Sequence, residues 1–272
     1  PDDWLERHIY SRHSLLGVSI MLLVDLLLFG PIGLTIWAVQ MIWIPLWAAG
    51  VINGLGHWWG YRNFESADGS TNISNIGVLI GGEELHNNHH AFPSSARFSM
   101  KPWEFDIGWF YIRLLSALGL AKVKRVAPQT MHDQSKDSID MDTVRAVVSA
   151  RMQVIASYAK RVTVPVWKIE LNQADAQFRD LLLHARSARL RIETRVTEGM
   201  RERLEAAMQN EALKPVYEFR QKLQHVWETA YQSQEQLLQA LQDWCREAEA
   251  TGNKYLQEFA RSLRSYRLDP VT

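Results

Sequence analysis

The sequence predicts an all-α protein made of a membrane helical hairpin, a cytosolic histidine-rich helical region and a soluble helical tail. Two observations predict this fold class. An almost uninterrupted apolar stretch covers residues 15–52, and from about residue 141 onward apolar residues recur at helical spacing among many charges. The mean hydropathy of −0.21 averages these unlike parts and describes neither of them.

Composition excludes several classes of protein. The 272 residues are enough for one or two domains with a sizeable core. With 30 basic and 30 acidic residues the formal net charge is zero, so the chain lacks the electrostatic footprint of a nucleic-acid-binding protein. Its single cysteine, Cys245, excludes an internal disulfide framework and a thiolate zinc cluster.

The apolar stretch predicts two membrane crossings, at about 14–30 and 32–53. A crossing takes about 20 apolar residues, and the Gly30-Pro31 pair breaks the stretch into two segments of about that length. The alternative is a buried helical pair in a soluble protein. Asp25 is the only ionisable residue in the stretch, so we expect it to be paired or to face other helices.

Basic residues flank the apolar stretch on both sides, and they are Arg7, Arg12, Lys122, Lys124 and Arg125. The positive-inside rule then puts both ends of the hairpin in the cytoplasm, and the protein in the membrane as a multi-pass chain. Most of the 11 tryptophans and the long apolar runs precede Pro128. We therefore expect domains at 1–128 and 129–272.

Four of the nine histidines gather in one short region. His86, His89 and His90 stand at i, i+3 and i+4, which places their side chains on one face of a helix. Asn53 and His57 form a second pair at i, i+4. Three imidazoles on one face suit two adjacent metal ions, and a thiolate-free set is compatible with iron, copper, nickel or zinc. A hydrogen-bonded structural role is the alternative for any single histidine, and Glu83 is either a carboxylate that orients an imidazole or a solvated loop acid.

These segments resemble the membrane fatty acid desaturases, in particular the bacterial acyl-CoA Δ9 group similar to stearoyl-CoA desaturase. The matching segments are NGLGHWWGYR at 53–62, STN at 70–72, GEELHNNHHAFP at 82–93, WEFD at 103–106 and LGLA at 118–121. The resemblance covers about residues 1–128 and implies a cytosolic di-iron centre held by histidines. It implies that His57, His86, His89 and His90 are iron ligands and that Asn53 reaches iron through a water.

The resemblance also implies roles around the metals for Glu83, Arg62, Asn72 and Asp106, either in orienting ligands or in the substrate channel. The family's reaction consumes O2 and two electrons and introduces a cis double bond into a fatty acyl chain. The implied partners are the lipid bilayer, a fatty acyl-CoA substrate and an electron donor such as a ferredoxin- or cytochrome-b5-like protein, with no nucleic acid.

The sequence departs from the family pattern at its beginning. The family has two further histidine clusters upstream of this region, and the chain begins after their expected place. His8 and His13 copy the spacing of the first cluster, but they stand where the family has no ligands. We therefore expect an N-terminally truncated desaturase that is inactive by itself, since four histidines and an asparagine do not complete two iron coordination spheres.

The second half predicts amphipathic helices at about 141–162, 168–210, 215–250 and 254–266, interrupted by Pro165, Pro215 and Gly252. Apolar residues at helical spacing include Leu181, Leu182, Leu183, Leu190 and Ile192, and a charged face carries Arg186, Arg189, Arg191 and Arg195. His132, His184 and His225 are isolated and are interpreted as structural. Helices of this kind form a bundle or a short coiled coil.

Two other functions remain open on the sequence. A membrane hydroxylase of alkanes or acyl chains uses similar histidine clusters, although the Asn53–His57 pair and the Gly-Glu-x-x-His lead-in favour a desaturase. The other alternative is a non-catalytic, membrane-anchored module whose helical tail binds another protein.

Overall fold

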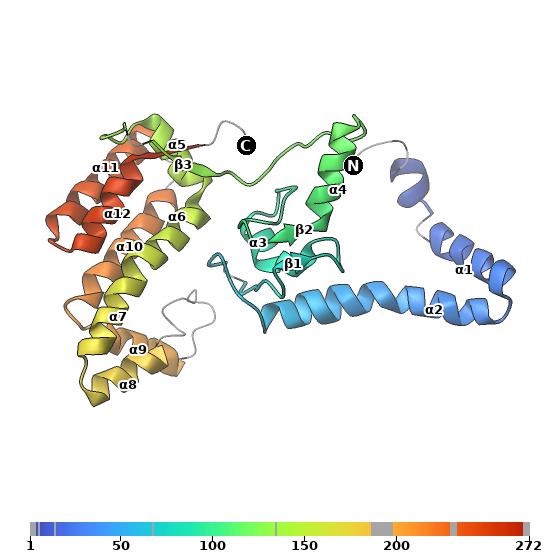
Figure 1. Ribbon diagram of the computed structural model, residues 1–272, viewed down its shortest axis with the longest axis horizontal. Coiled ribbons are helices and arrows are strands. Elements are labelled where there is room, and N and C mark those ends of the chain that lie inside the picture. The colour runs from blue at the N-terminus through green and yellow to red at the C-terminus, as the bar shows by residue number, and fades with distance from the viewer. Residues whose placement is uncertain are drawn as a thin grey trace. The chain divides into compact units, whose positions relative to one another are not determined.

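Over the residues that it describes, the computed structural model is predominantly helical, as the sequence predicts, with four very short strands (Figure 1). It describes residue 4 and residues 6–13, 15–66, 68–133, 135–185, 198–228 and 233–268. The chain divides into two compact units, Pro1–Leu55 and Gly56–Thr272. The predicted boundary near residue 128 lies within the second unit and stays a prediction.

The first unit consists of two apolar helices joined by a tight turn. Helix α1 covers Leu16–Phe29, and helix α2 covers Ile32–Pro45 and continues as a π-helical segment through Leu46–Gly54. Gly30 ends α1 with a φ of 61°, and Pro31 begins α2, so the Gly30-Pro31 pair separates the helices where the sequence predicts.

One helix of the described chain, Ile32–His57, is long and apolar enough to cross a membrane, judged by length and composition. Helix α1 is apolar but has 14 residues, fewer than the roughly 20 that a crossing takes. The first predicted crossing, at about 14–30, therefore stays a prediction.

Helices α1 and α2 pack against each other within the first unit. Trp37 Nε1 donates to the Val18 carbonyl at 3.1 Å. A Cβ atom on Gly33 would lie 2.1 Å from the Asp25 carbonyl oxygen, so only glycine permits this approach. Asp25 is buried, as expected of a residue that faces other helices, and the described residues show no hydrogen-bond partner for its Oδ2.

The N-terminal part of the second unit holds the histidines on short elements. These elements are the parallel pair β1 (Ile76–Gly77) and β2 (Phe105–Asp106), α3 (His86–Ala91) and α4 (Ile107–Ala117). The apolar cluster here is small and contains Phe64, Phe92 and Ala127. Much of what holds this region together is therefore polar.

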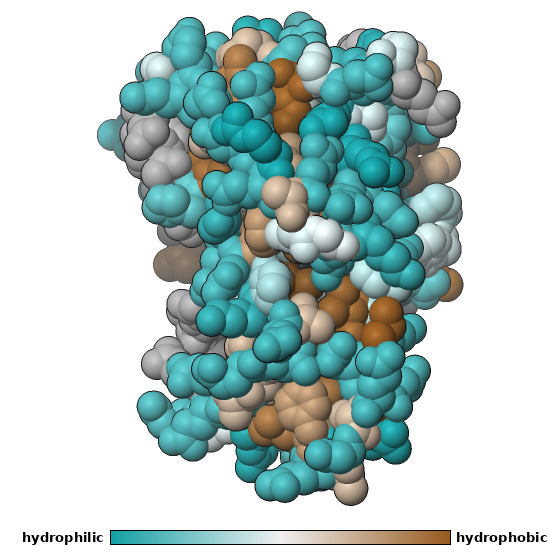
Figure 2. Space-filling model, turned by 90° about the vertical axis from the view of Figure 1, so that its left-hand side faces the viewer, coloured by the Kyte–Doolittle hydropathy of each residue, from teal (hydrophilic) through white to brown (hydrophobic). Residues whose placement is uncertain are grey.

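The C-terminal part of the second unit is a bundle around one large apolar core. Its helices are α5 (Met141–Ser149), α6 (Arg151–Tyr158), α7 (Val164–Gln173), α8 (Ala176–Ala185), α9 (Glu198–Ala207), α10 (Leu213–Glu228), α11 (Gln234–Ala250) and α12 (Lys254–Arg264). Its core includes the fully buried Tyr158, Trp167 and Phe259. The antiparallel pair β3 (Thr130–His132) and β4 (Tyr266–Leu268) joins the two ends of this part. The face shown in Figure 2 is mainly hydrophilic, as expected of a solvated bundle.

The predicted long helices of the second half are wrong in their extents, because local capping ends them earlier. Ala174 is extended, and the Asp175 carboxylate accepts from the Phe178 N–H, so α7 ends and α8 starts within the predicted 168–210 helix. Ser233 and Gln236 form a capping box that starts α11 within the predicted 215–250 helix. Leu190, Ile192 and the four arginines of the predicted charged face lie outside the described residues.

Candidate metal centre

The segment His86-Asn-Asn-His-His divides its side chains between two tasks. Asn87 accepts from the main-chain N–H groups of Asn63 and Phe64 at 2.8 and 2.9 Å, and it donates to the Phe64 carbonyl at 2.9 Å. Asn88 bonds to Asn72 and Glu104. The two asparagines are fully buried and tie α3 to the loops around it. The histidines of the same helix take no part in these contacts, so their imidazoles remain available for another role.

His57 is brought to this helix by the loop that follows it. The N–H and the hydroxyl of Thr71 both donate to the Gly56 carbonyl, at 2.6 and 2.9 Å, directly beside His57. Tyr61 and Asn72 pair through their main chains, which brings the Gly60 position close to residue 72. Gly60 has a φ of 141°, and a Cβ there would lie 2.2 Å from the Asn72 carbonyl oxygen, so this close pairing requires glycine.

Three imidazoles meet as a result. The Nε2 atoms of His57 and His86 are 3.1 Å apart, and His57, His86 and His90 each offer a nitrogen within 4.8 Å of the others. Two nitrogens bound to one ion at about 2.1 Å, with an angle near 90–110°, are separated by roughly 3.0–3.4 Å. The distance between the two Nε2 atoms therefore fits ligation of a shared metal ion.

His89 lies beside this group without belonging to it. Its ring centroid is 5.5 Å from that of His90 and 4.7 Å from that of Phe98. Its nitrogens are not among those that lie within 4.8 Å of one another. The Nδ1 atoms of His86 and His89 are buried without a hydrogen-bond partner in the described chain.

Burial favours the neutral, metal-binding form of one of these imidazoles, that of His89. Burial lowers the pKa of His89, although the Glu83 charge opposes this shift. The contact with His86 holds the pKa of Glu83 below its usual value, with burial opposing. Glu83 Oε2 is 3.8 Å from His86 Nδ1, slightly longer than a hydrogen bond, which is where a carboxylate that orients this imidazole would stand.

Asp68 is a site residue that the sequence reasoning missed. Its carboxylate bonds to His90 Nδ1, and its main-chain carbonyl lies 3.1 Å from His57 Nδ1. Burial raises the pKa of Asp68, but hydrogen bonds from Ser70 and Ser66 and the charge of His90 outweigh it and hold the pKa well below the usual value. Asp68 is 22 residues from His90, so no local spacing signals this contact.

The other predicted site residues have structural partners. Asn72 is fully buried and accepts from the Asn88 N–H. Asp106 caps α4 through the Trp109 N–H and also accepts from the Phe98 N–H. Arg62 donates to the Ser66 carbonyl at 2.8 Å. Asn53 belongs to the first unit, where it donates to the Ala48 carbonyl, and its role at the metal stays a prediction.

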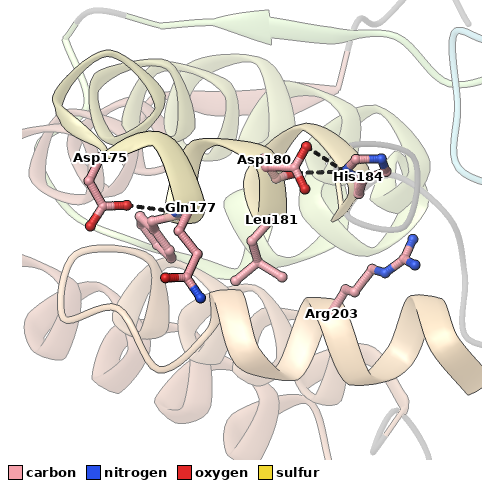
Figure 3. A pocket seen from close by; sticks show the side chains of 7 residues that line it. Asp175, Gln177, Asp180, Leu181, His184 and Arg203 are labelled. Carbon is pink, nitrogen blue, oxygen red and sulfur yellow. Dashed lines mark hydrogen bonds and ion pairs between the residues drawn. The ribbon is translucent and has the colours of Figure 1, made fainter.

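A cavity of about 620 Å³ lies between α8 and α9, away from the histidine cluster in the sequence (Figure 3). Its lining includes Asp175, Asp180, His184 and Arg203. His184 Nδ1 is 2.8 Å from the Asp180 carbonyl and 3.3 Å from its carboxylate, contacts within one helix that agree with a structural histidine. Among the described residues, the only group suited to a metal is the one formed by His57, His86 and His90.

Comparisons with known proteins point to desaturases for part of the chain. It is 40% identical over 82 residues to an sn-2 palmitoyl-lipid 9-desaturase of Nostoc sp. (strain 36), covering 30% of the chain and 28% of that protein. It is 38% identical over 127 residues to an acyl-CoA 5-desaturase of Anemone leveillei, covering 46% and 36%. Identity to delta-9 acyl-lipid desaturase 1 of Arabidopsis thaliana is 46% over 71 residues, covering 26% and 23%.

These relatives support the resemblance to fatty acid desaturases and a link to lipid desaturation. The chain spans less than half the length of each of them. A transposase family model matches residues 140–270, the helical bundle for which sequence reasoning found no resemblance. No solved structure matches the chain.

Proposed function

We propose that the histidine-bearing part of this chain contributes to the metal centre of a membrane fatty acid desaturase that uses a histidine-ligated di-iron centre. The observation that carries the proposal is the meeting of His57 with His86 and His90, from segments about 30 residues apart, at a spacing that fits a shared ion. The similarity to desaturases supplies the substrate class, a fatty acyl chain.

The proposed reaction removes two hydrogens from neighbouring carbons of an acyl chain, as acyl-CoA. One O2, two electrons and two protons enter, and one cis double bond and two waters leave, so atoms and electrons balance. When bound, iron would supply the activation of O2 that removal of hydrogen from an unactivated C–H bond needs. The electrons come from a carrier of the ferredoxin or cytochrome b5 type.

In this proposal His57, His86, His89 and His90 are iron ligands, and Asn53 reaches iron through a water. Glu83 orients His86, and the buried asparagines of α3 keep the three histidines of that helix on the same side. In the family that the chain resembles, upstream histidine clusters supply the remaining iron ligands. The protein sits in the membrane as a multi-pass chain, with the histidines and the helical tail on the cytoplasmic side.

Co-expression tests this proposal. The chain is produced in a host together with a separate desaturase segment that carries the upstream histidine clusters, and fatty acid methyl esters are analysed for new alkenes. We expect alkenes with the wild-type chain and none with His86→Ala, whereas His184→Ala serves as a matched control that keeps the product. Alkene formation that survives His86→Ala would contradict the proposal.

The same assay separates the two alternatives. Hydroxylated chains without any alkene would identify a hydroxylase. Absence of any product, with a folded chain that also binds no iron, would leave the membrane-anchored interaction module. Iron analysis of the chain purified alone provides an independent measure, and two irons per chain would contradict the expectation of an incomplete site.

The match of residues 140–270 to transposases gives a second candidate function, DNA strand transfer by the helical bundle. Phosphoryl transfer of this kind is commonly supported by metal ions gathered by carboxylates. The described residues contain no such acidic group, and the net charge of the chain is zero. Desaturation therefore stands first. Magnesium-dependent nicking or joining of duplex DNA by the purified chain would reverse this order.

A further inference from the structure

We propose that Asp68 is a positioning residue that fixes the imidazoles of both His57 and His90 for metal binding. This inference rests on the proposed function, because it assumes that these histidines bind a metal. It goes beyond the ligands themselves, because Asp68 acts on two imidazoles through two different groups, its main-chain carbonyl and its carboxylate.

The main-chain contact determines the tautomer of His57. A carbonyl oxygen only accepts hydrogen bonds, so the Nδ1 of His57, at 3.1 Å from the Asp68 carbonyl, must carry the proton. In a neutral ring the lone pair then lies on Nε2. That atom is the one that faces His86 Nε2 at 3.1 Å, so the contact leaves the metal-binding nitrogen of His57 unprotonated.

The carboxylate does the same for His90. Its Oδ2 bonds to His90 Nδ1, and its Oδ1 accepts from the Ser70 N–H at 2.9 Å, which holds the carboxylate in place from its other side. Nδ1 of His90 therefore donates, and Nε2 carries the lone pair. A carboxylate behind a ligating imidazole also increases its basicity and restricts its rotation, and loss of such a group typically weakens metal binding about 10–100-fold.

The loop geometry explains how one residue reaches two rings. In sequence, Asp68 stands between Ser66 and Ser70, whose hydroxyls bond to each other at 2.8 Å, and both serines accept a hydrogen bond from Asn87 of α3. The loop is thus attached to the helix that carries His90. Asp68 therefore keeps its position relative to the histidines without contacting a metal itself.

The test is a tautomer measurement on the metal-free chain, labelled with ¹⁵N-histidine and studied by NMR. We expect Nδ1–H tautomers at His57 and His90 in the wild-type chain. In Asp68→Ala the side chain is lost but the main-chain carbonyl remains, so His90 should lose its tautomer preference while His57 keeps it. An Nε2–H tautomer at His90 in the wild-type chain would overturn the proposal, and this readout requires no variant to fold.

Metal binding gives the second readout, with Co²⁺ as the probe. Asp68→Ala should raise the dissociation constant about 10–100-fold. Asp68→Asn keeps an oxygen acceptor for His90 and should therefore lose less Co²⁺ affinity than Asp68→Ala. Asp133→Ala, which removes an aspartate bonded to Ser135 and Arg267, is the matched control and should bind as wild type. A Co²⁺ affinity of Asp68→Ala equal to that of the wild-type chain would contradict the positioning role.

The two proposals fail in distinguishable ways. If the tautomers and Co²⁺ affinities behave as expected but co-expression yields no alkene, the desaturase proposal fails and the positioning role stands. If alkenes form while Asp68→Ala leaves the tautomers and the affinity unchanged, the positioning role fails and the desaturase proposal stands.

Discussion

Single carboxylates organise the histidine region. Glu104 is the clearest example, because its Oε1 accepts from Tyr61 and Asn63 and its Oε2 from Asn88 and the main-chain N–H groups of Met100 and Lys101. Burial, followed by the contact with Glu104, raises the pKa of Tyr61 well above its usual value, so this phenol stays a donor. One buried side chain thus satisfies donors from three separate segments.

Removal of the Glu104 side chain is therefore expected to destabilise the fold. In Glu104→Ala these buried donors lose their acceptor, and we expect a loss of about 3 kcal/mol in the free energy of unfolding. Urea unfolding followed by circular dichroism measures it. Glu258→Ala, on the exposed face of α12, is the matched control and should change the free energy by less than about 0.5 kcal/mol. Equal effects would show that the Glu104 network does not stabilise the fold.

Cys245 illustrates a residue whose environment suppresses its chemistry. It is buried in the bundle core, and burial raises the pKa of its thiol to about 12, so the reactive thiolate is scarce at neutral pH. We expect a thiol reagent to modify the native chain slowly and the urea-unfolded chain rapidly. Rapid modification of the native chain would show that this part of the core opens easily.

The elements show which features a sequence alone reveals. The i, i+3, i+4 spacing of three histidines predicted a shared face, and α3 with its clustered rings agrees with it. The contacts of Asp68 with His90 and of Glu104 with Tyr61 were not predictable, because they join residues 22 and 43 positions apart across loops without periodicity. The predicted extents of the long helices were wrong for a local reason. Caps at Asp175 and Ser233 start new helices inside continuous amphipathic patterns.

Capping also provides a pH-dependent prediction at helix α5. Burial raises the pKa of Asp140, but hydrogen bonds from Lys136 and Thr143 prevail and lower it from 3.8 to about 2. Because the folded-state pKa is depressed, the stabilisation by this cap is present above about pH 4 and is lost as the pH falls towards 2. Asp140→Ala should therefore cost about 1 kcal/mol at pH 7 and much less at pH 2.

Urea unfolding of the wild-type chain and of Asp140→Ala at several pH values measures the difference in their free energies of unfolding. The matched control is Asp142→Ala, which removes a neighbouring exposed aspartate of the same helix that pairs only with Arg145 in the first turn. The Asp140→Ala variant should lose less unfolding free energy, relative to the wild-type chain, at pH 2 than at pH 4. A loss that stays the same at both pH values would contradict the assignment of Asp140 as the cap.

At the scale of the molecule, one ion pair connects the histidine region to the helical bundle within the second unit. Arg220 of α10 bonds to Glu65, and both side chains are about 90% buried. Burial raises the pKa of Glu65, and the charge of Arg220 opposes this shift. This contact joins the part that resembles desaturases to the part that a transposase family model matches.

A double-mutant cycle measures the strength of this connection. Glu65→Ala or Arg220→Met alone removes one member of this buried ion pair and should lower the free energy of unfolding by about 3–5 kcal/mol. The double variant should lower the free energy of unfolding by clearly less than the sum of the two single losses. The exposed pair Arg145–Asp142 is the control and should show a coupling of about 0–1 kcal/mol. Additive effects at Glu65 and Arg220 would show that the two parts unfold independently.

The small apolar cluster of Phe64, Phe92 and Ala127 has a thermodynamic consequence for the histidine region. Heat capacity rises on unfolding because apolar surface becomes hydrated, whereas hydration of polar groups lowers it. A region stabilised largely through amides and carboxylates should show a heat-capacity increment below the usual 12–15 cal/mol/K per residue or so. Its stability should then change little with temperature, so a calorimetric trace would separate its shallow transition from the sharper melting of the leucine- and tryptophan-rich bundle.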